Sequence, residues 1–244
     1  MNPEEFVQAL KQLGIRLNDR QRQQFDLYYH LLIKANRVVN LTTITSGPEV
    51  YLKHFYDSIT PARFVESLRH HTLSVCDVGA GAGFPSLPLK IVFPQLKVTI
   101  IDSLNKRINF LRKLVDRLGL KNVSLYHARA EDFGNRRSQH REKYDLVIAR
   151  AVARLNVLSE FCLPLVRIGG QFVAMKSVNA PQELDRARYA IDQLGGRILN
   201  DHTFKLPVSG DLRRIIVIRK QKRTPEKYPR RAGTPNRKPL TSTN

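Results

Sequence analysis

Apolar residues recur with helical spacing through the first 71 residues of the chain. Spacings of three and four residues place apolar side chains on one face of a helix. The first such face consists of Phe6, Val7, Leu10 and Leu13; a second, capped by Asn18 or Asp19, includes Phe25, Tyr28, Leu32 and Ala35; a third starts at Pro48 and carries Val50, Leu52, Phe55 and Ile59. Residues 1–71 are therefore predicted to form a helical N-terminal part.

The pattern changes at Leu73, where short apolar runs begin to alternate with helical segments. Predicted strands cover residues 73–78, 98–102, 123–127, 144–149 and 171–176, and predicted helices cover 85–92, 103–118 and 156–166. This alternation is typical of a mostly parallel sheet with helices on both faces. A helix at 181–194 precedes two further strands, 197–204 and 213–219, which can pair antiparallel at one edge. We predict an α/β fold with an open sheet of roughly seven strands over residues 72–220.

The composition changes again after Arg219. The basic residues Lys220, Lys222, Arg223, Lys227, Arg230, Arg231, Arg237 and Lys238 face only Glu226, and Pro225, Pro229, Pro235 and Pro239 interrupt any helix. Such a segment cannot bury enough apolar surface to fold alone. We predict that residues 221–244 are a disordered basic arm that adds a salt-sensitive contribution to nucleic-acid binding.

The whole chain is strongly basic, with 41 Lys and Arg against 21 Asp and Glu and a formal net charge of +20. This imbalance favours a polyanionic partner, most often nucleic acid. An anionic membrane is the alternative, but the chain has no basic amphipathic helix with a broad apolar face and no lipidation signal. We find no apolar run long enough for a transmembrane helix and no secretory signal.

Two cysteines, Cys76 and Cys162, lie far apart in apolar segments without a neighbouring His or Cys cluster. This arrangement indicates small buried residues in a reducing compartment. It predicts neither a disulfide nor a metal site, and a cytoplasmic location follows.

A glycine-rich loop at residues 79–83 carries the strongest chemical signal. Gly79, Gly81 and Gly83 follow the first predicted strand and open the first helix of the sheet, where glycines let a ligand approach the main chain. Their spacing differs from the Gly-x-Gly-x-x-Gly of dinucleotide-binding proteins. Asp102 ends the next strand, where a carboxylate can accept hydrogen bonds from ribose hydroxyls. The alternative is that the glycines only form a turn and that Asp102 caps the next helix.

Several other residues lie at or just after the ends of predicted strands, at the same edge of the sheet. Asp77 either contacts the ligand or braces the loop, and Phe84 either packs on the ligand or seats the helix. Ala130 and Glu131 follow the third strand, where main-chain amides and an acid can bind the amino group of an adenine, or where Glu131 simply caps a helix. Arg150 ends the fourth strand, which favours contact with a ligand or substrate.

Together these motifs closely resemble the bacterial 16S rRNA guanine-N7 methyltransferase G family, also called the glucose-inhibited division protein B family. The resemblance rests on residues 77–85, 40–42, 53–58, 102–107, 150–151, 174–176 and 227–235, and thus spans nearly the whole chain. It implies a class I S-adenosylmethionine-dependent methyltransferase fold (Rossmann-like) with an N-terminal helical part. Ser86 stands where another glycine is expected, which affects packing more than cofactor choice.

The resemblance implies methyl transfer from S-adenosylmethionine to N7 of a guanine at position 527, in the 530 loop of 16S rRNA. The matching motifs assign cofactor contacts to Gly79, Phe84, Ala130, Glu131 and Arg150. Asp102 is the expected ribose ligand by its place in the fold, and Asp77, Gly81 and Gly83 would shape the loop. The expected partner is 16S rRNA or the small ribosomal subunit. No coiled coil or exposed apolar stripe is evident, so we expect a monomer.

Guanine N7 carries a lone pair that attacks without prior loss of a proton, so we expect no acid–base catalytic residue, covalent intermediate or metal. Catalysis would rest on alignment and on stabilising moving charge. The candidates for positioning the substrate are Asn40, His54, Asp57, Arg129 and Lys176. Arg129 and Lys176 would anchor RNA phosphates or the guanine edge. His54 and Asp57 would either help to position the substrate or form a mutual hydrogen bond that pins the N-terminal helices to the sheet.

Two other functions compete with this hypothesis. One is a methyltransferase that acts on another RNA, a protein or a small molecule; the charge of +20 argues against a small molecule. The other is a non-catalytic RNA-binding or assembly factor that retains the fold. The complete glycine loop and Asp102 argue against it.

Overall fold

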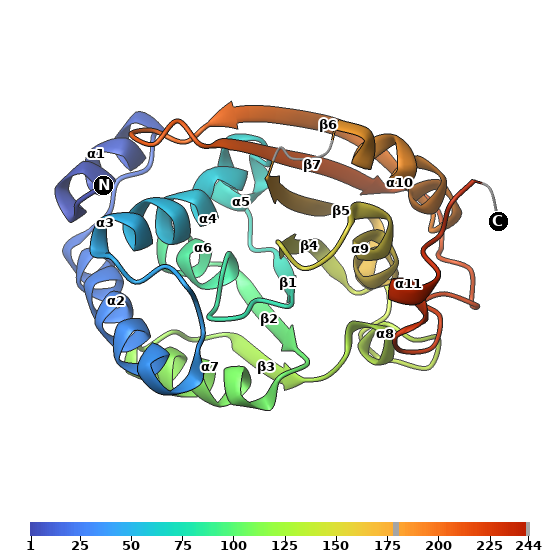
Figure 1. The fold of residues 1–244 in the computed structure, drawn as a ribbon, viewed down its shortest axis with the longest axis horizontal. Helices are drawn as coiled ribbons and strands as arrows, with labels where there is room; N and C mark the ends of the chain where they lie inside the picture. Colours follow the sequence, from blue (N-terminus) through green and yellow to red (C-terminus); the bar gives the residue numbers. More distant parts are fainter. Residues whose placement is uncertain (178–180, 243–244) are drawn as a thin grey trace.

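The computed structural model of the chain describes residues 1–177 and 181–242 and is built around a seven-stranded sheet (Figure 1). The strands are β1 (Ser74–Val78), β2 (Lys97–Asp102), β3 (Val123–His127), β4 (Tyr144–Arg150), β5 (Val166–Ser177), β6 (Gly196–Lys205) and β7 (Leu212–Lys220). Their order is β3-β2-β1-β4-β5-β7-β6, with β1 to β5 parallel. β7 is antiparallel to both β5 and β6. The predicted mostly parallel sheet with an antiparallel edge pair is confirmed.

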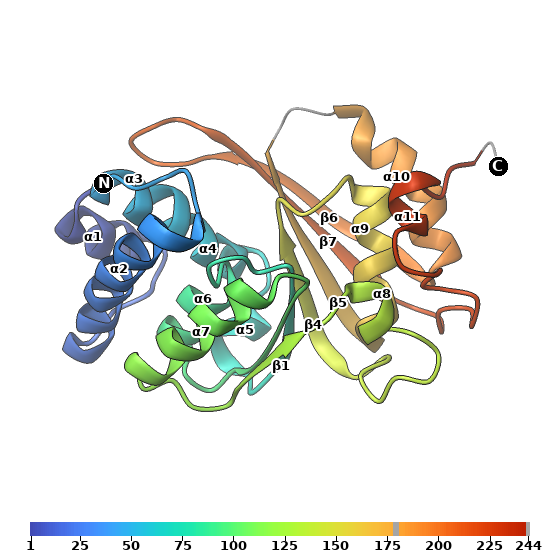
Figure 2. The same ribbon diagram turned by 60° about the horizontal axis from the view of Figure 1, so that its bottom comes forward.

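Helices cover both faces of the sheet, as Figure 2 shows. α6 (Ser86–Val92) and α7 (Asn105–Arg117) lie on one side, and α8 (Ala130–Phe133), α9 (Leu155–Cys162), the short turn η3 (Leu163–Leu165) and α10 (Pro181–Gln193) on the other. Successive strand residues point to opposite faces. Val75, Ile100 and Ile148 belong to one buried cluster, whereas Cys76, Ile101 and Val147 belong to the other. Both cysteines are fully buried, and burial raises the pKa of each thiol.

The N-terminal helices extend the first of these two cores. α1 (Pro3–Gln12) and α2 (Asp19–Val39) begin at capping boxes, in which Asn2 pairs with Glu5 and Asn18 with Gln21. Phe6, Phe25 and Phe55 are buried in the cluster that also contains the α6 and α7 residues against the sheet. The N-terminal part and the sheet therefore share one continuous core.

The helix predicted from Pro48 is divided into short pieces: α3 (Gly47–Glu49), the π-helical η1 (Val50–Tyr56), α4 (Asp57–Ile59), the 3-10 turn η2 (Thr60–Arg63) and, after a break, α5 (Ser67–His70). Between Val50 and Ala62 every side chain except that of Lys53 is buried. A helix enclosed on all sides is not restricted to a single apolar stripe. The wider π-helical turn alters the spacing of its carbonyl groups, and the Lys53 carbonyl accepts a hydrogen bond from Arg150.

The C-terminal segment, residues 221–242, lies against the sheet domain, so the prediction that it is disordered is wrong over this range. Thr224, Tyr228 and Pro235 are buried, and the segment contains a short helix, α11 (Thr234–Arg237). Composition did not predict this order, because polar contacts with the sheet domain hold the segment in place. Arg141 donates hydrogen bonds to the Thr224 and Tyr228 carbonyls. Residues 243–244 of the predicted arm lie outside the described residues.

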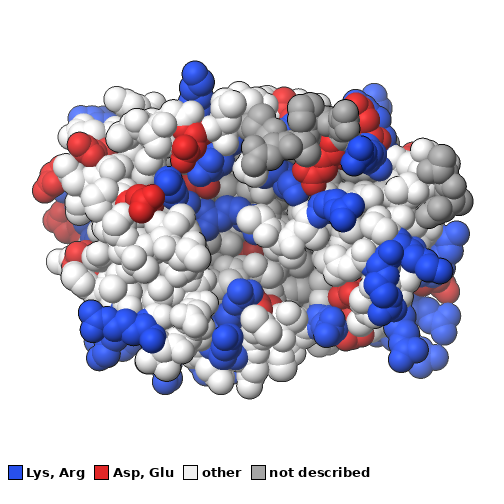
Figure 3. Space-filling view, in the orientation of Figure 1, with Lys and Arg blue, Asp and Glu red and all other residues white. Residues whose placement is uncertain are grey.

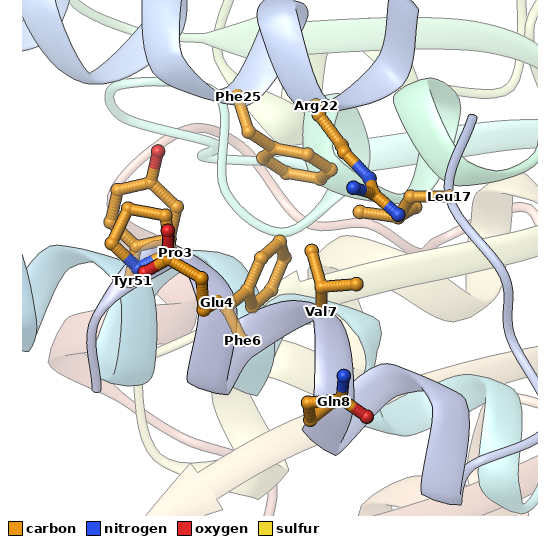
Figure 4. A pocket seen from close by; sticks show the side chains of 9 residues that line it. All are labelled: Pro3, Glu4, Phe6, Val7, Gln8, Leu17, Arg22, Phe25 and Tyr51. Carbon is orange, nitrogen blue, oxygen red and sulfur yellow. The ribbon is translucent and has the colours of Figure 1, made fainter. Parts of the chain in front are cut away.

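A groove of about 210 Å³ between α1 and α2 lies on the N-terminal part, lined by Phe6, Val7 and Phe25 among others (Figure 4). It shares no lining residue with the cavities beside the glycine loop that are described below. Over residues 1–177 and 181–242, no helix is both long enough and apolar enough to cross a membrane.

Candidate active site

Three adjoining cavities lie at the carboxyl ends of the parallel strands. The β3-side cavity, about 190 Å³, is lined by Ile101, Ala128, Ala130, Glu131, Phe161 and Asn236 among others. The loop cavity, about 420 Å³, is lined by Thr42, Gly81, Phe84 and Arg107 among others. The arginine cavity, about 330 Å³, is lined by Asp57, Met175, Lys176, Arg213 and Arg214 among others.

These cavities adjoin one another and are treated as one crevice. The β3-side and loop cavities share Gly79, Asp102 and Val152, and the loop and arginine cavities share His54 and Arg150. Figure 3 shows this side of the molecule hollowed near its centre, with Lys and Arg side chains gathered around the hollow. Because the strands are parallel, residues that follow four different strands meet here.

The glycine loop forms the floor of the crevice, and each of its glycines has a positive φ, of +75° at Gly79, +60° at Gly81 and +104° at Gly83. A Cβ atom on Gly81 would meet nothing within 4 Å, so this residue faces open space. A Cβ on Gly83 would lie 2.6 Å from the Tyr28 hydroxyl, so that glycine is required for packing against α2. The loop thus has one glycine open to a ligand and another that seats the N-terminal part.

Asp102 lies in the middle of the crevice with only 2% of its surface exposed. Its Oδ2 accepts hydrogen bonds from the Gly81 amide at 3.1 Å and from Arg107 at 3.3 Å, and its Oδ1 accepts one from the Leu104 amide at 2.9 Å. The carboxylate therefore holds the loop and the start of α7 together. The two predicted roles of Asp102, ribose ligand and helix cap, are compatible. Asp102 lines both cavities, and it also accepts a hydrogen bond from the Leu104 amide at the start of α7.

Asp77 is fully buried below the loop and braces it, since its Oδ2 accepts a hydrogen bond from the Ser86 amide at 3.0 Å. Burial raises the pKa of Asp77 to about 7, against the opposing effect of its contacts with Ser86. Among the described residues neither Asp77 Oδ1 nor the Ser86 hydroxyl has a partner. Ser86 itself is fully buried at the start of α6.

Phe84 connects the glycine loop to the N-terminal helices. Its ring stacks on Tyr28 at 5.4 Å and on His54 at 4.5 Å between centroids, and the Arg150 guanidinium lies 5.1 Å from it. Phe84 also lines the loop cavity. The ring therefore seats the helices and borders the ligand space at once.

Arg150 lies between His54 and Asp57, so the direct hydrogen bond considered between those two side chains is replaced by a bridge. Arg150 donates to the Lys53 carbonyl at 3.1 Å and lies 3.3 Å from His54 Nδ1 and 3.5 Å from Asp57 Oδ2. Arg213 donates to the same Asp57 oxygen at 3.1 Å. Asp57 Oδ1 is buried and has no partner among the described residues.

The tautomer of His54 follows from these contacts. Burial, and then the charge of Arg150, lower the pKa of His54 to about 3, so the ring is neutral. Arginine has only donors, so Nδ1 accepts and Nε2 carries the proton. Nε2 then donates to the Thr42 hydroxyl at 2.9 Å, which also accepts from the Ile44 amide at 3.0 Å. With both acceptor positions of Thr42 used, its own proton remains available to a ligand in the loop cavity.

The other predicted residues lie at different places. Ala130 and Glu131 line the β3-side cavity, as does the exposed Arg129. Lys176, at the opposite end of the crevice, donates to the Ala153 carbonyl at 2.7 Å and pairs with Glu183 at 2.7 Å. Asn40 is exposed at the C-terminal end of α2, with a φ of +51°, and lines none of the three cavities.

The structure adds residues that the sequence pattern did not single out: Thr42, Val152, Arg213 and Asn236. Thr42 belongs to the motif at residues 40–42, from which the sequence analysis selected Asn40 as a candidate and not Thr42. Arg213 reaches the crevice only because β7 lies beside β5. Val152 lies against Gly79, since a Cβ atom on Gly79 would be 2.9 Å from the Val152 side chain. Val152 lines both the β3-side and the loop cavity. Among the described residues no group of three or more His, Cys, Asp or Glu side chains could hold a metal ion.

The family model described as rRNA small subunit methyltransferase G (GidB) matches residues 21–208. The chain belongs to the rRNA small subunit methyltransferase G family. A relative named ribosomal RNA small subunit methyltransferase G, from Lactiplantibacillus plantarum, is 61% identical over 242 residues, which cover 99% of each chain.

Solved structures support the fold. The chain is similar to a SAM-dependent methyltransferase from Aquifex aeolicus, with a TM-score of 0.51 and 19% identity, over 69% of this chain and 92% of that one. It is also similar to M. jannaschii TYW2 in complex with AdoMet, with a TM-score of 0.50 and 15% identity, over 66% and 74%. The predicted family, class I fold and methyltransferase activity are confirmed, and with them S-adenosylmethionine as the cofactor.

Proposed function

We propose that this enzyme methylates N7 of a guanine in 16S rRNA, at position 527 in the 530 loop, and acts in the cytoplasm as a monomer on the small ribosomal subunit or its RNA. The observation that carries the proposal is the crevice formed by the three adjoining cavities. It joins a glycine-floored end, where Asp102 and Glu131 supply carboxylates, to an end lined by Arg150, Lys176 and Arg213. The net charge of +20 supports a polyanionic substrate.

The cofactor end fits S-adenosylmethionine on three observations. Gly81 leaves open space above the loop, Asp102 places a carboxylate between the two cavities, and Ile101 and Phe161 supply apolar walls to the β3-side cavity. In this arrangement Asp102 would hold the ribose and the β3-side cavity the adenine, with Gly79, Ala130 and Glu131 along it. Phe84, Arg150 and Thr42 would border the remaining, amino-acid end.

The substrate end fits a guanine. When bound, the cofactor supplies an electrophilic methyl group on sulfur, and the N7 lone pair must stay free to attack it. Cationic donors must therefore bind guanine at O6 or at its phosphates rather than at N7. Arg213 and Lys176 line the arginine cavity in positions to do this.

No proton transfer is needed, so the residues contribute alignment and charge. Positive charge moves onto the base during the reaction, and the Asp57 carboxylate lies in the same cavity. The neutral state of His54 keeps a further positive charge out of this region. Arg129 and Asn40 lie outside the arginine cavity and would contact flanking RNA.

The test is methyl transfer from labelled S-adenosylmethionine to small ribosomal subunits that lack the modification, with the modified base mapped by strand cleavage specific for N7-methylguanine. A single labelled guanine in the 530 loop is the expected result. Label at another nucleotide would retain the enzyme class and refute the proposed target. Absence of label on any ribosomal substrate would refute the proposed substrate class.

A further inference from the structure

The C-terminal segment reaches into the crevice at its β3 end. Asn236, in α11, lines the β3-side cavity together with Ala128, Ala130 and Glu131. This part of the chain lies beyond residue 208, where the match to the family model ends. The segment was predicted to be an RNA-binding arm, and its position against the proposed adenine end suggests a different role.

The segment also sets the orientation of Glu131. The Gly233 amide donates a hydrogen bond to Glu131 Oε1 at 2.8 Å, and the Glu131 side chain is buried. Gly233 has a φ of +81°, a conformation that side chains rarely adopt, so the chain can turn there and present its amide. The direction of this carboxylate therefore depends on a residue of the C-terminal segment.

Contacts independent of any ligand hold the segment in place. Glu160 is fully buried, and its carboxylate accepts hydrogen bonds from three nitrogen atoms of Arg230. These are the Arg230 amide at 2.8 Å, Nε at 2.9 Å and Nη2 at 2.6 Å. Tyr228 is buried in the cluster that contains Phe161, itself a wall of the β3-side cavity. The wall formed by the segment is thus built into the folded protein.

We propose that residues 224–237 are part of the cofactor site, where Asn236 contacts the edge of the adenine and Gly233 holds Glu131 in position to do the same. A carboxamide offers a donor and an acceptor side by side, which matches the N6 amino group and a neighbouring ring nitrogen of adenine. The proposal rests on the placement of adenine in the β3-side cavity.

The experiment is calorimetric binding of S-adenosylhomocysteine and of S-inosylhomocysteine to the full-length enzyme, without RNA. The inosyl compound carries an oxygen in place of the N6 amino group. Asn236→Ala should weaken binding of S-adenosylhomocysteine about tenfold, the effect of one or two hydrogen bonds, and leave binding of S-inosylhomocysteine nearly unchanged. Lys238→Ala is the control, because Lys238 is exposed in the same segment and lines none of the three cavities.

Two results would overturn the proposal: unchanged affinity of Asn236→Ala for S-adenosylhomocysteine, or an equal loss for both ligands, which would indicate a structural role. Failure of the wild-type enzyme to bind S-adenosylhomocysteine would instead refute the placement of the cofactor in the crevice. The two failures are therefore distinguishable.

Discussion

The N-terminal helices and the C-terminal segment lie at opposite ends of the same crevice, yet they attach to the sheet by different means. The helices share an apolar core with one face of the sheet, in which Phe55 contacts Phe6, Phe25 and Tyr28. The segment contributes Tyr228 to the core on the other face and is held mainly by polar contacts. Each supplies residues to the crevice: His54 and Asp57 at one end, Asn236 at the other.

The difference concerns where the stabilising free energy is concentrated. Apolar attachment is spread over many contacts, and losing any part of it affects the whole core. Polar attachment depends on a few partners, such as the pair formed by Arg230 and the fully buried Glu160. Loss of one partner should therefore release the segment while the sheet stays folded.

The largest effect is expected from Phe55→Ala. Removal of a fully buried ring should lower the free energy of unfolding by about 4 kcal/mol, and urea denaturation should still show one transition because the helices and the sheet share a core. Phe55→Leu is the control and should lose less. A separate early transition for the N-terminal helices would contradict the shared core.

Arg230→Met should have a smaller and more local effect. It leaves the Glu160 carboxylate buried without its partner, at a cost of about 3 kcal/mol at most, since the segment can detach and admit water. We expect faster proteolysis after residue 220 and weaker binding of S-adenosylhomocysteine. Lys227→Met, at an exposed position, should change neither. Unaltered proteolysis of Arg230→Met would show that the ion pair is not the anchor.

The pH dependence of stability should depend on His54 at the N-terminal end. Its pKa falls from 6.5 to about 3 on folding, so the unfolded chain takes up a proton below pH 6.5 that the folded protein excludes. Stability is therefore complete above pH 6.5 and is lost as the pH falls toward 3. Relative to His54→Gln, the wild type should lose about 1.4 kcal/mol between pH 5.5 and 4.5. Parallel profiles for the two proteins would refute a buried neutral imidazole.

The smallest effect is expected from the exposed cations of the C-terminal segment. Arg231→Ala should reduce the slope of the logarithm of RNA affinity against the logarithm of salt concentration by about one unit, if this side chain neutralises a phosphate. Arg16→Ala, on the linker between α1 and α2, is the control and should leave the slope unchanged. Equal slopes for the wild type, Arg231→Ala and Arg16→Ala would refute an RNA contact of Arg231 and leave the segment only its proposed role beside the cofactor.

Much of the fold was predictable because its signals are local. Strands β1 to β4 begin and end within about two residues of their predicted bounds, since short apolar runs end at turn residues. The glycine loop and Asp102 were found from spacing alone. Strand β5 begins at Val166, five residues earlier than predicted, because its first part pairs at Tyr144.

The site was less predictable because its contacts join residues far apart in the chain. Arg213 reaches Asp57 across 156 residues, and Gly233 reaches Glu131 across 102. No periodicity marks such partners. The contacts of the Lys176 amine with the Ala153 carbonyl and the Glu183 carboxylate were not predictable for the same reason.

The sequence by itself determined the parallel sheet, the family and the loop on which the cofactor site is built, because apolar periodicity and glycine spacing act over a few residues. Only the tertiary structure decided that the basic C-terminal segment forms a wall of the crevice. It also decided that His54 is neutral and that Thr42 has a proton to donate. These properties depend on burial and on long-range hydrogen bonds, which exist only once the chain has folded.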